Sequence, residues 1–180
     1  MPATPTHLVS DMKIPFLTPK NHDLSRLIAA IASNGSDDID TMAHFMEQEM
    51  WDALAPYLEP ESFDRGYLLT TQGAYDRTLY FIESGTVRVH FTDAQRQIHI
   101  ANLGPGSVVG EASFFSHFER SATVQAVMPC QVWSLTPERF ARLSKEKPTV
   151  ALTLAMALGA TVSVRLLNLS KRLSQSPGQV

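Results

Sequence analysis

Apolar residues near the start of the chain recur at helical spacing. Leu24, Leu27, Ile28 and Ile31 lie three or four positions apart, and the turn-forming run Asn34-Gly35-Ser36 follows them. This pattern predicts a short amphipathic helix that ends near residue 34.

A second set of apolar residues has the same period and ends before Pro56. It predicts one further helix, with Asp38 or Asp40 as the N-cap. Its members are Met42, Phe45, Met46, Met50 and Leu54. Packing of this stripe against the domain is preferred to a groove for a partner.

From Ser62 to Leu135 the pattern changes to short runs in which apolar and polar positions alternate. Val87, Val89 and Phe91 are expected to face inward, whereas Thr86, Arg88 and His90 are expected to face water. Glycines separate the runs, where the chain must turn sharply. They are Gly66, Gly73, Gly85, Gly104 and Gly106. Many short strands at nearly regular spacing indicate a compact barrel or roll.

After Leu135 the period is helical again. Thr136-Pro137-Glu138 has the composition of a helix start, and Pro148 is expected to open a long last helix. Alternating steps of three and four form a heptad seam in this last segment, about three repeats long. Its members are Leu152, Ala155, Gly159, Val162, Leu166, Leu169 and Leu173.

These patterns predict an α+β fold. We expect a β-roll, a jelly-roll-like barrel of about eight strands, flanked by N-terminal helices and by two C-terminal helices. The predicted organisation is an N-terminal arm with short helices over residues 1–45, a domain over 46–174 and a tail over 175–180.

Charge and composition narrow the possible functions. A net charge of −3 argues against a phosphate-backbone binder, so no DNA partner is expected. The single Cys130 is expected to fill the core. The first 20 residues lack the features of a secretory signal, which predicts a cytoplasmic protein. The longest uncharged run, residues 148–164, is shorter than the ~20 apolar residues of a membrane span.

One stretch carries candidate chemistry, Val109-Gly110-Glu111-Ala112-Ser113 followed by Arg120-Ser121-Ala122. A glycine lets the backbone approach a ligand, and a following helical turn directs free N–H groups at an anion. The Arg120 guanidinium can pair with two phosphate oxygens, and the Glu111 carboxylate can accept from a sugar hydroxyl. The combination points to a sugar phosphate.

This stretch resembles the phosphate-binding cassette of the cyclic nucleotide-binding domain family. In that family an apolar residue and Gly-Glu precede a short helix, and Arg-(Ser/Thr/Ala)-Ala-(Thr/Ser)-Val-x-Ala follows it. The resemblance extends over roughly residues 54–173 and departs mildly at Val109 and Ser113.

The resemblance implies a role for each matching residue. Glu111 would bind the ribose 2′-hydroxyl and Arg120 the cyclic phosphate, while Ser121 would contact the phosphate or the base. Backbone amides of Gly110, Glu111, Ala112 and Ala122 would complete the seat, with Ser113 beside them. The regulatory ligand would be cAMP or cGMP, with no metal, and an apolar residue around Leu154 to Leu158 would cover the base.

The function expected from this is a non-enzymatic, cyclic-nucleotide-sensing regulatory protein that acts through an unidentified protein partner, with a homodimer formed through the 149–173 helix. One alternative is a degenerate fold that acts as a ligand-free interaction module. Another is a cupin-type metalloenzyme, although His90 and His99, which could face each other, are not accompanied by a His-x-His pair. A transcription factor is disfavoured, because only seven residues follow Leu173.

Overall fold

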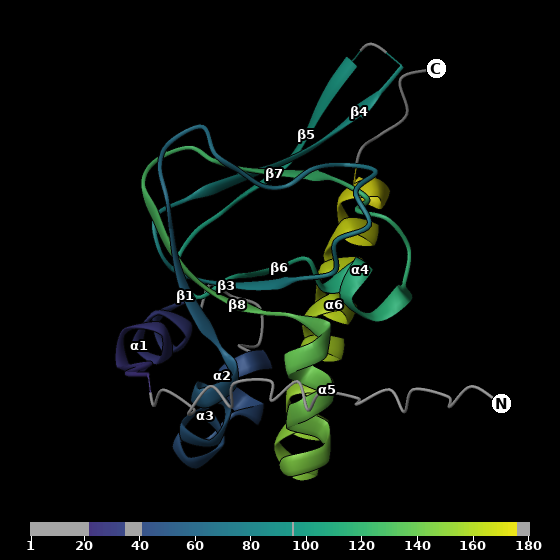
Figure 1. Ribbon diagram of the computed structural model, residues 1–180. Helices are drawn as coiled ribbons and strands as arrows, with labels where there is room; N and C mark the ends of the chain where they lie inside the picture. Colours follow the sequence, from purple (N-terminus) through teal and green to yellow (C-terminus); the bar gives the residue numbers. More distant parts are fainter. Residues whose placement is uncertain (1–21, 35–40, 95, 176–180) are drawn as a thin grey trace, which may run out of the picture.

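A computed structural model describes residues 22–34, 41–94 and 96–175. The molecule has three layers, which Figure 1 shows from one side. Two four-stranded antiparallel sheets form a roll, and a layer of helices covers the outer face of one sheet. The eight strands and the flanking helices confirm the predicted fold class.

The first sheet lies between the second sheet and the helices. Its strand order is β1-β8-β3-β6. The strands are β1 (Glu59–Phe63), β8 (Cys130–Leu135), β3 (Leu79–Ser84) and β6 (Val108–Val109).

The second sheet has the order β2-β7-β4-β5. Its strands are β2 (Leu68–Thr70), β7 (Thr123–Ala126), β4 (Val87–Asp93) and β5 (Arg96–Leu103). β4 and β5 form the long hairpin that projects from the roll in Figure 1.

Both faces of β3 are buried, which makes the first sheet a wall shared by two apolar clusters. Tyr80 and Ile82 point into the roll, whereas Leu79 and Phe81 point at the helices. Alternation of side chains along a strand produces this division. A strand buried on both faces appears in the sequence as a continuous apolar run, and Leu79 to Ile82 is such a run.

The N-terminal helices pack into the outer cluster. α1 (Ser25–Ser33) buries Leu27 and Ile31 and ends at Asn34, as the sequence predicts. The second predicted helix is wrong as a single element, because it is divided into α2 (Thr41–Phe45), α3 (Gln48–Leu54) and the 3-10 turn Ala55–Tyr57. The backbone leaves the helical region at Glu47, where ψ is 165°. The predicted caps at Asp38 and Asp40 lie outside the described residues.

The C-terminal helices begin where the sequence places them. The Thr136 side chain accepts a hydrogen bond from the Arg139 N–H at the start of α5 (Pro137–Glu146). α6 (Pro148–Gln175) buries one face in the outer cluster, through Val150, Ala151, Leu154, Ala157 and Leu158.

α6 is also the one described helix whose length and composition would allow a membrane crossing, over Pro148–Lys171. A core helix of a soluble domain passes the same test, and the α6 face formed by Leu154 and Leu158 packs against the rest of this domain.

Two predictions about single residues have different outcomes. Cys130 is buried inside the roll as expected, and burial raises the pKa of its thiol. The prediction that His90 faces water is wrong, because only 6% of its surface is exposed. It does pair with His99 across the β4–β5 hairpin, and His99 is exposed.

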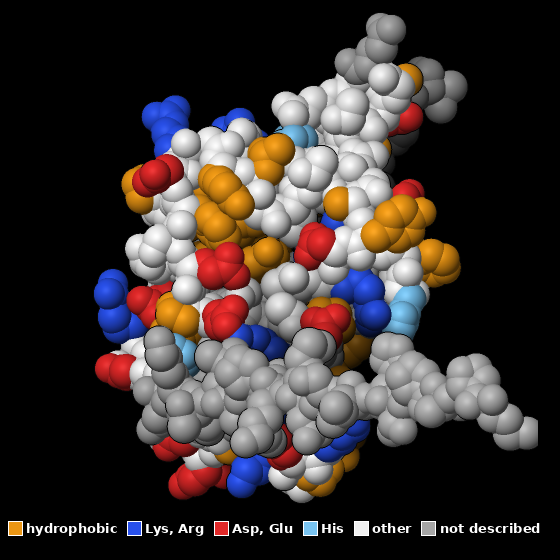
Figure 2. All heavy atoms as spheres, viewed as in Figure 1, with side chains coloured by type: hydrophobic (Ala, Val, Ile, Leu, Met, Phe, Trp, Pro, Cys, Tyr) orange, Lys and Arg blue, Asp and Glu red, His pale blue; other side chains and the backbone are white. Residues whose placement is uncertain are grey.

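The surface shown in Figure 2 mixes charges of both signs. Basic and acidic side chains are interspersed on this face, with apolar groups between them.

The turn between β5 and β6 is fixed by close contact with α1, which yields a prediction about stability. Gly106 has a φ of +80°, and a Cβ there would lie 2.4 Å from the Ala30 carbonyl oxygen. We expect Gly106→Ala to lower the free energy of unfolding by about 2 kcal/mol or more, because left-handed backbone and a steric clash both add cost.

Gly104→Ala is the matched control, since a Cβ at that position would have no neighbour within 4 Å and the φ of Gly104 is not positive. Urea denaturation of the two variants makes the comparison. Equal stabilities would contradict the close packing of α1 against the turn.

Candidate functional site

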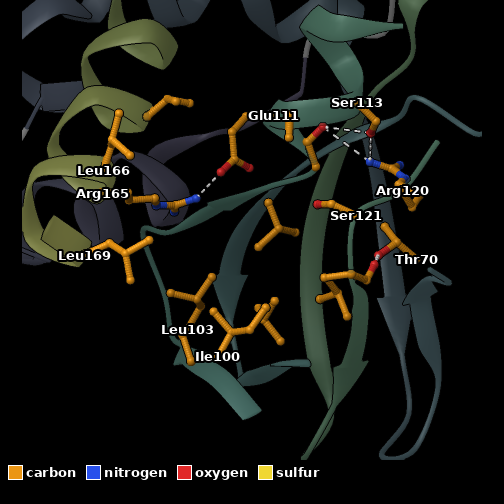
Figure 3. A pocket seen from close by; sticks show the side chains of 18 of the residues that line it. Thr70, Ile100, Leu103, Glu111, Ser113, Arg120, Ser121, Arg165, Leu166 and Leu169 are labelled. Atoms are coloured by element: carbon orange, nitrogen blue, oxygen red, sulfur yellow. Dashed lines mark hydrogen bonds and ion pairs between the residues drawn. The ribbon is translucent and has the colours of Figure 1, made fainter. Parts of the chain in front are cut away.

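A cavity of about 530 Å³ opens between the roll and the C-terminal half of α6. This volume is typical of small-molecule sites, which range from about 300 to 1,000 Å³. Most of its apolar wall comes from β5 and α6, and most of its polar groups come from the segment between β6 and β7 (Figure 3). The apolar wall includes Ile100, Leu103, Val162, Leu166 and Leu169.

The polar end of the cavity is built on a glycine turn. Gly110 has a φ of +92°, and a Cβ there would lie 2.5 Å from Nη1 of Arg120 and 2.6 Å from the Thr78 carbonyl oxygen. Glycine therefore meets two requirements at this position, a left-handed backbone and a close approach. The short helix α4 (Glu111–Ser116) begins directly after it. The first N–H groups of a helix have no intrahelical acceptor and are available to an anion.

Arg120 is buried, with 3% of its surface exposed, and its guanidinium binds protein atoms on every side. Nε and Nη2 donate to the two carboxylate oxygens of Asp76 at 2.7 and 2.6 Å, and Nη2 also donates to the Thr78 carbonyl at 2.6 Å. Nη1 donates to the Ser113 hydroxyl at 2.8 Å and to the Gly110 carbonyl at 3.3 Å. These five hydrogen bonds use all five N–H groups of the side chain.

The carboxyl group of Asp76 is held in its ionised form. Partial burial raises its pKa, but hydrogen bonds from Arg120 and Thr78 outweigh that effect and leave the pKa below its ordinary value. The charge on Asp76 therefore compensates the charge of the buried guanidinium, which would be costly to bury alone.

Glu111 faces the opposite side of the cavity and is held by a residue of α6. Arg165 donates from Nη1 to Oε1 of Glu111 at 2.5 Å and from Nη2 to the Val108 carbonyl at 2.8 Å. The Arg165 and Glu111 side chains are 36% and 16% exposed. Figure 3 shows the carboxylate directed at α6 and the guanidinium of Arg120 on the far side of the cassette.

The structure brings all of the predicted site residues to this cavity. Its wall contains Gly110, Glu111, Ala112, Ser113, Arg120, Ser121 and Ala122. Sequence reasoning missed Asp76, which precedes β3, and Arg165, which lies 54 positions after Glu111. The sequence did contain a signal for Arg165, because it is the single charged residue in the stretch 148–170.

The predicted cover for the base is wrong. Leu154 and Leu158 are completely buried among the helices, and they face the outer cluster instead of the cavity. α6 reaches the cavity about two turns later, through Val162, Leu166 and Leu169. These three residues belong to the heptad seam that the sequence predicts.

Metal ligands do not gather among the described residues, where no group of three or more His, Cys, Asp or Glu side chains could hold an ion. The His90–His99 pair has no third partner of this kind in the described part of the chain.

Residues 60–147 match the family model of the cyclic nucleotide-binding domain. The chain is also similar to regulatory proteins of other organisms. The Cyclic AMP receptor protein of Thermus thermophilus is 33% identical over 116 residues, which are 64% of this chain and 54% of that protein. A cAMP-dependent protein kinase regulatory subunit of Yarrowia lipolytica is 30% identical over 98 residues, which are 54% of this chain and 25% of that protein.

Residues 60–147 belong to the cyclic nucleotide-binding domain family. Solved structures agree. A cyclic nucleotide-binding domain from Methylobacillus flagellatus has a TM-score of 0.71 at 20% identity, with 87% of this chain and 86% of that chain covered, and it supports the fold. The Thermus thermophilus Catabolite Activator Protein has a TM-score of 0.63 at 31% identity, with 74% and 62% covered.

The chain spans about half the length of the first of these curated relatives. The receptor protein and the regulatory subunit are regulatory proteins and not themselves enzymes, and this chain has the same domain.

The Asp76–Arg120 contact generates a pH prediction for the cyclic nucleotide-binding domain. Because the pKa of Asp76 is depressed in the folded state, its stabilisation is present above about pH 4 and is lost as pH falls through the folded-state pKa. We expect Asp76→Asn to lower the free energy of unfolding at pH 7 by about 2 kcal/mol, since Arg120 loses a charged acceptor. The difference from wild type should shrink below pH 4.

Asp52→Asn is the control, because Asp52 lies on an exposed surface and accepts only from the Gln48 side chain in the described contacts. Denaturation at pH 3, 5 and 7 measures both variants. A stability difference for Asp76→Asn that stayed constant down to pH 3 would contradict the ion pair.

Proposed function

We propose that the chain is a sensor for cAMP or cGMP that acts through protein contacts. The observation that carries the proposal is the cavity whose wall holds both Glu111 and Arg120 around the start of α4, within a domain of this family. Relatives named for cyclic AMP, among them the Thermus receptor protein, support cAMP as the first ligand to test.

The arrangement suits a molecule with one anionic end and one apolar end. The phosphate sits at the first-turn amides of α4, beside the Ser113 hydroxyl and the Nη1 edge of Arg120. That edge donates to neutral acceptors, whereas the Nε and Nη2 edge is held by a carboxylate. A phosphate oxygen therefore replaces the longest of the five bonds, from Nη1 to the Gly110 carbonyl, while the Asp76 pair persists.

The sugar and base extend from this seat toward α6. Arg165 donates a hydrogen bond to Oε1 of Glu111, and the other carboxylate oxygen, Oε2, accepts one from a ribose hydroxyl. The base lies against the aliphatic wall formed by Leu103, Val162 and Leu166. The ligand thus bridges the roll and α6, and its preference for the closed arrangement shifts the population of α6 positions.

The alternative of a ligand-free interaction module has one observation in its favour. Both charged residues of the proposed site already have partners within the chain, Arg120 through five hydrogen bonds and Glu111 through Arg165 on one of its two carboxylate oxygens. A direct binding measurement separates the two functions.

Isothermal titration calorimetry against cAMP and cGMP provides that measurement. We expect binding to the wild-type chain and at least a tenfold loss for Glu111→Ala, because a hydrogen bond to a charged group contributes about 1.5 to 3 kcal/mol. The loss should be much smaller with 2′-deoxy-cAMP, which lacks the hydroxyl that Glu111 binds.

Glu119→Gln is the matched control, since Glu119 is exposed and lies outside the cavity wall. Arg120 is a poor probe here, because its removal takes away the counter-charge of Asp76 and so also lowers the stability of the fold. No heat with either nucleotide would favour the ligand-free module.

The outward face of α6 offers a surface for signalling, and we assign it to a second copy of the chain. Leu152, Met156 and Leu167 are between 52% and 62% exposed there. An exposed apolar stripe on a helix that has no charge between residues 148 and 164 fits a contact between two helices.

Sedimentation equilibrium tests the dimer. We expect a particle of twice the 19.9 kDa chain mass for wild type and a shift to monomer for Met156→Glu, because a carboxylate would be buried in an apolar seam. Met128→Glu is the control, since Met128 is 47% exposed on a turn of the roll. A wild-type monomer with or without nucleotide would refute this assignment.

A further inference from the structure

The cassette helix α4 is too short to hold its position alone. It has six residues and lies between two left-handed caps, Gly110 before it and His117, whose φ is +61°, after it. Isolated helices of this length are unstable in water, and the carbonyl groups of the last turn have no partners within the helix. Contacts from outside must therefore fix its position.

Arg77 supplies such a contact at the C-terminal end of α4. Its Nε donates to the Ser113 carbonyl at 3.1 Å and its Nη2 donates to the Phe114 carbonyl at 2.7 Å. Nη2 also lies 3.3 Å from Nε2 of His117. A cation at this end of a helix is favourable, and the planar fork of arginine fixes two adjacent acceptors.

Ser113 connects this contact to the anion seat. Its carbonyl accepts from Arg77, and its hydroxyl accepts from Nη1 of Arg120 at 2.8 Å. The Ser113 residue is only 3% exposed, so it has little freedom to move. Asp76, the neighbour of Arg77 in the chain, holds the opposite edge of the Arg120 guanidinium.

Two adjacent residues before β3 thus grip both halves of the cassette. Asp76 holds Arg120 and Arg77 holds α4, which sets the distance between the guanidinium and the first-turn amides. Arg77 is not part of the cavity wall, so it has no contact with a bound molecule there.

We propose that Arg77 is a positioning residue that determines affinity for the phosphate end of the ligand without touching it. This inference rests on the proposed nucleotide-binding function. It means that Arg77, which lies outside the anion seat, determines how well the seat distinguishes one phosphate geometry from another.

The test compares the Arg77→Met variant with wild type in calorimetric titrations with cAMP and with its two phosphorothioate diastereomers. In each diastereomer sulfur replaces a different one of the two exocyclic phosphate oxygens. The ratio of their affinities therefore reports how the seat contacts each oxygen. We expect cAMP affinity to fall at least fivefold and the preference between the diastereomers to diminish. A merely structural role would leave that preference unchanged in the folded fraction.

Two further variants keep the test sharp. Arg139→Met is the matched control, because Arg139 also donates to a main-chain carbonyl, that of Tyr57, away from the cavity. Arg77→Lys keeps the charge and loses the fork, so it should fold and bind with intermediate affinity. Combining Arg77→Met with Ser113→Ala should cost less than the sum of the single losses, because both act through Ser113.

The outcomes separate the two proposals. Absence of cAMP and cGMP binding by wild type would overturn the proposed function. Binding by wild type, with unchanged affinity and diastereomer preference in Arg77→Met, would overturn the role of Arg77. If Arg77→Met does not fold, wild-type affinity and preference in Arg77→Lys would overturn it equally.

Discussion

The buried guanidinium of Arg120 is the interaction on which the candidate site depends. A charge that is almost completely removed from water is tolerated only when every donor has an acceptor and a counter-charge lies nearby. Asp76 supplies the counter-charge, and Thr78, Gly110 and Ser113 supply the remaining acceptors. These residues come from the segment before β3 and from the cassette, so one side chain ties distant parts of the sequence together.

This requirement also explains the glycine at position 110. The backbone there must turn with a positive φ and must leave room for the Arg120 side chain, and a Cβ would prevent both. The Gly-Glu and Arg motifs are ten positions apart in the sequence, yet the glycine and the arginine are in direct contact.

The sequence was sufficient for elements set by local patterns. The strand β4, the Thr136 N-cap and the end of α1 follow from alternation, capping and a turn sequence that act within a few residues. The break at Glu47 was not predictable in this way, because the apolar stripe continues across it. The burial of His90 depends on what covers one face of β4, and alternation within the strand does not contain that information.

The site was predictable to a similar extent. The cassette residues are close in sequence and carry a family motif, so Glu111 and Arg120 were found. Their partners Asp76 and Arg165 come from segments 44 and 54 positions away, and no short-range rule relates them to the cassette. The face of α6 that meets the cavity was misplaced by about two turns, because the helix first passes through the outer cluster before it reaches the roll.

The sharing of β3 between two clusters has a consequence for the size of the unit that folds cooperatively. The family match covers residues 60–147, but Phe81 and Trp133 belong to an apolar cluster that also contains residues from both sides of that segment, among them Leu27 of α1 and Leu154 of α6. If residues 60–147 were produced alone, the face of the first sheet that packs against these helices would expose apolar side chains to water. The smallest part of this chain that folds on its own therefore has to include Leu24 and Leu158, which lie well outside the limits of the family match.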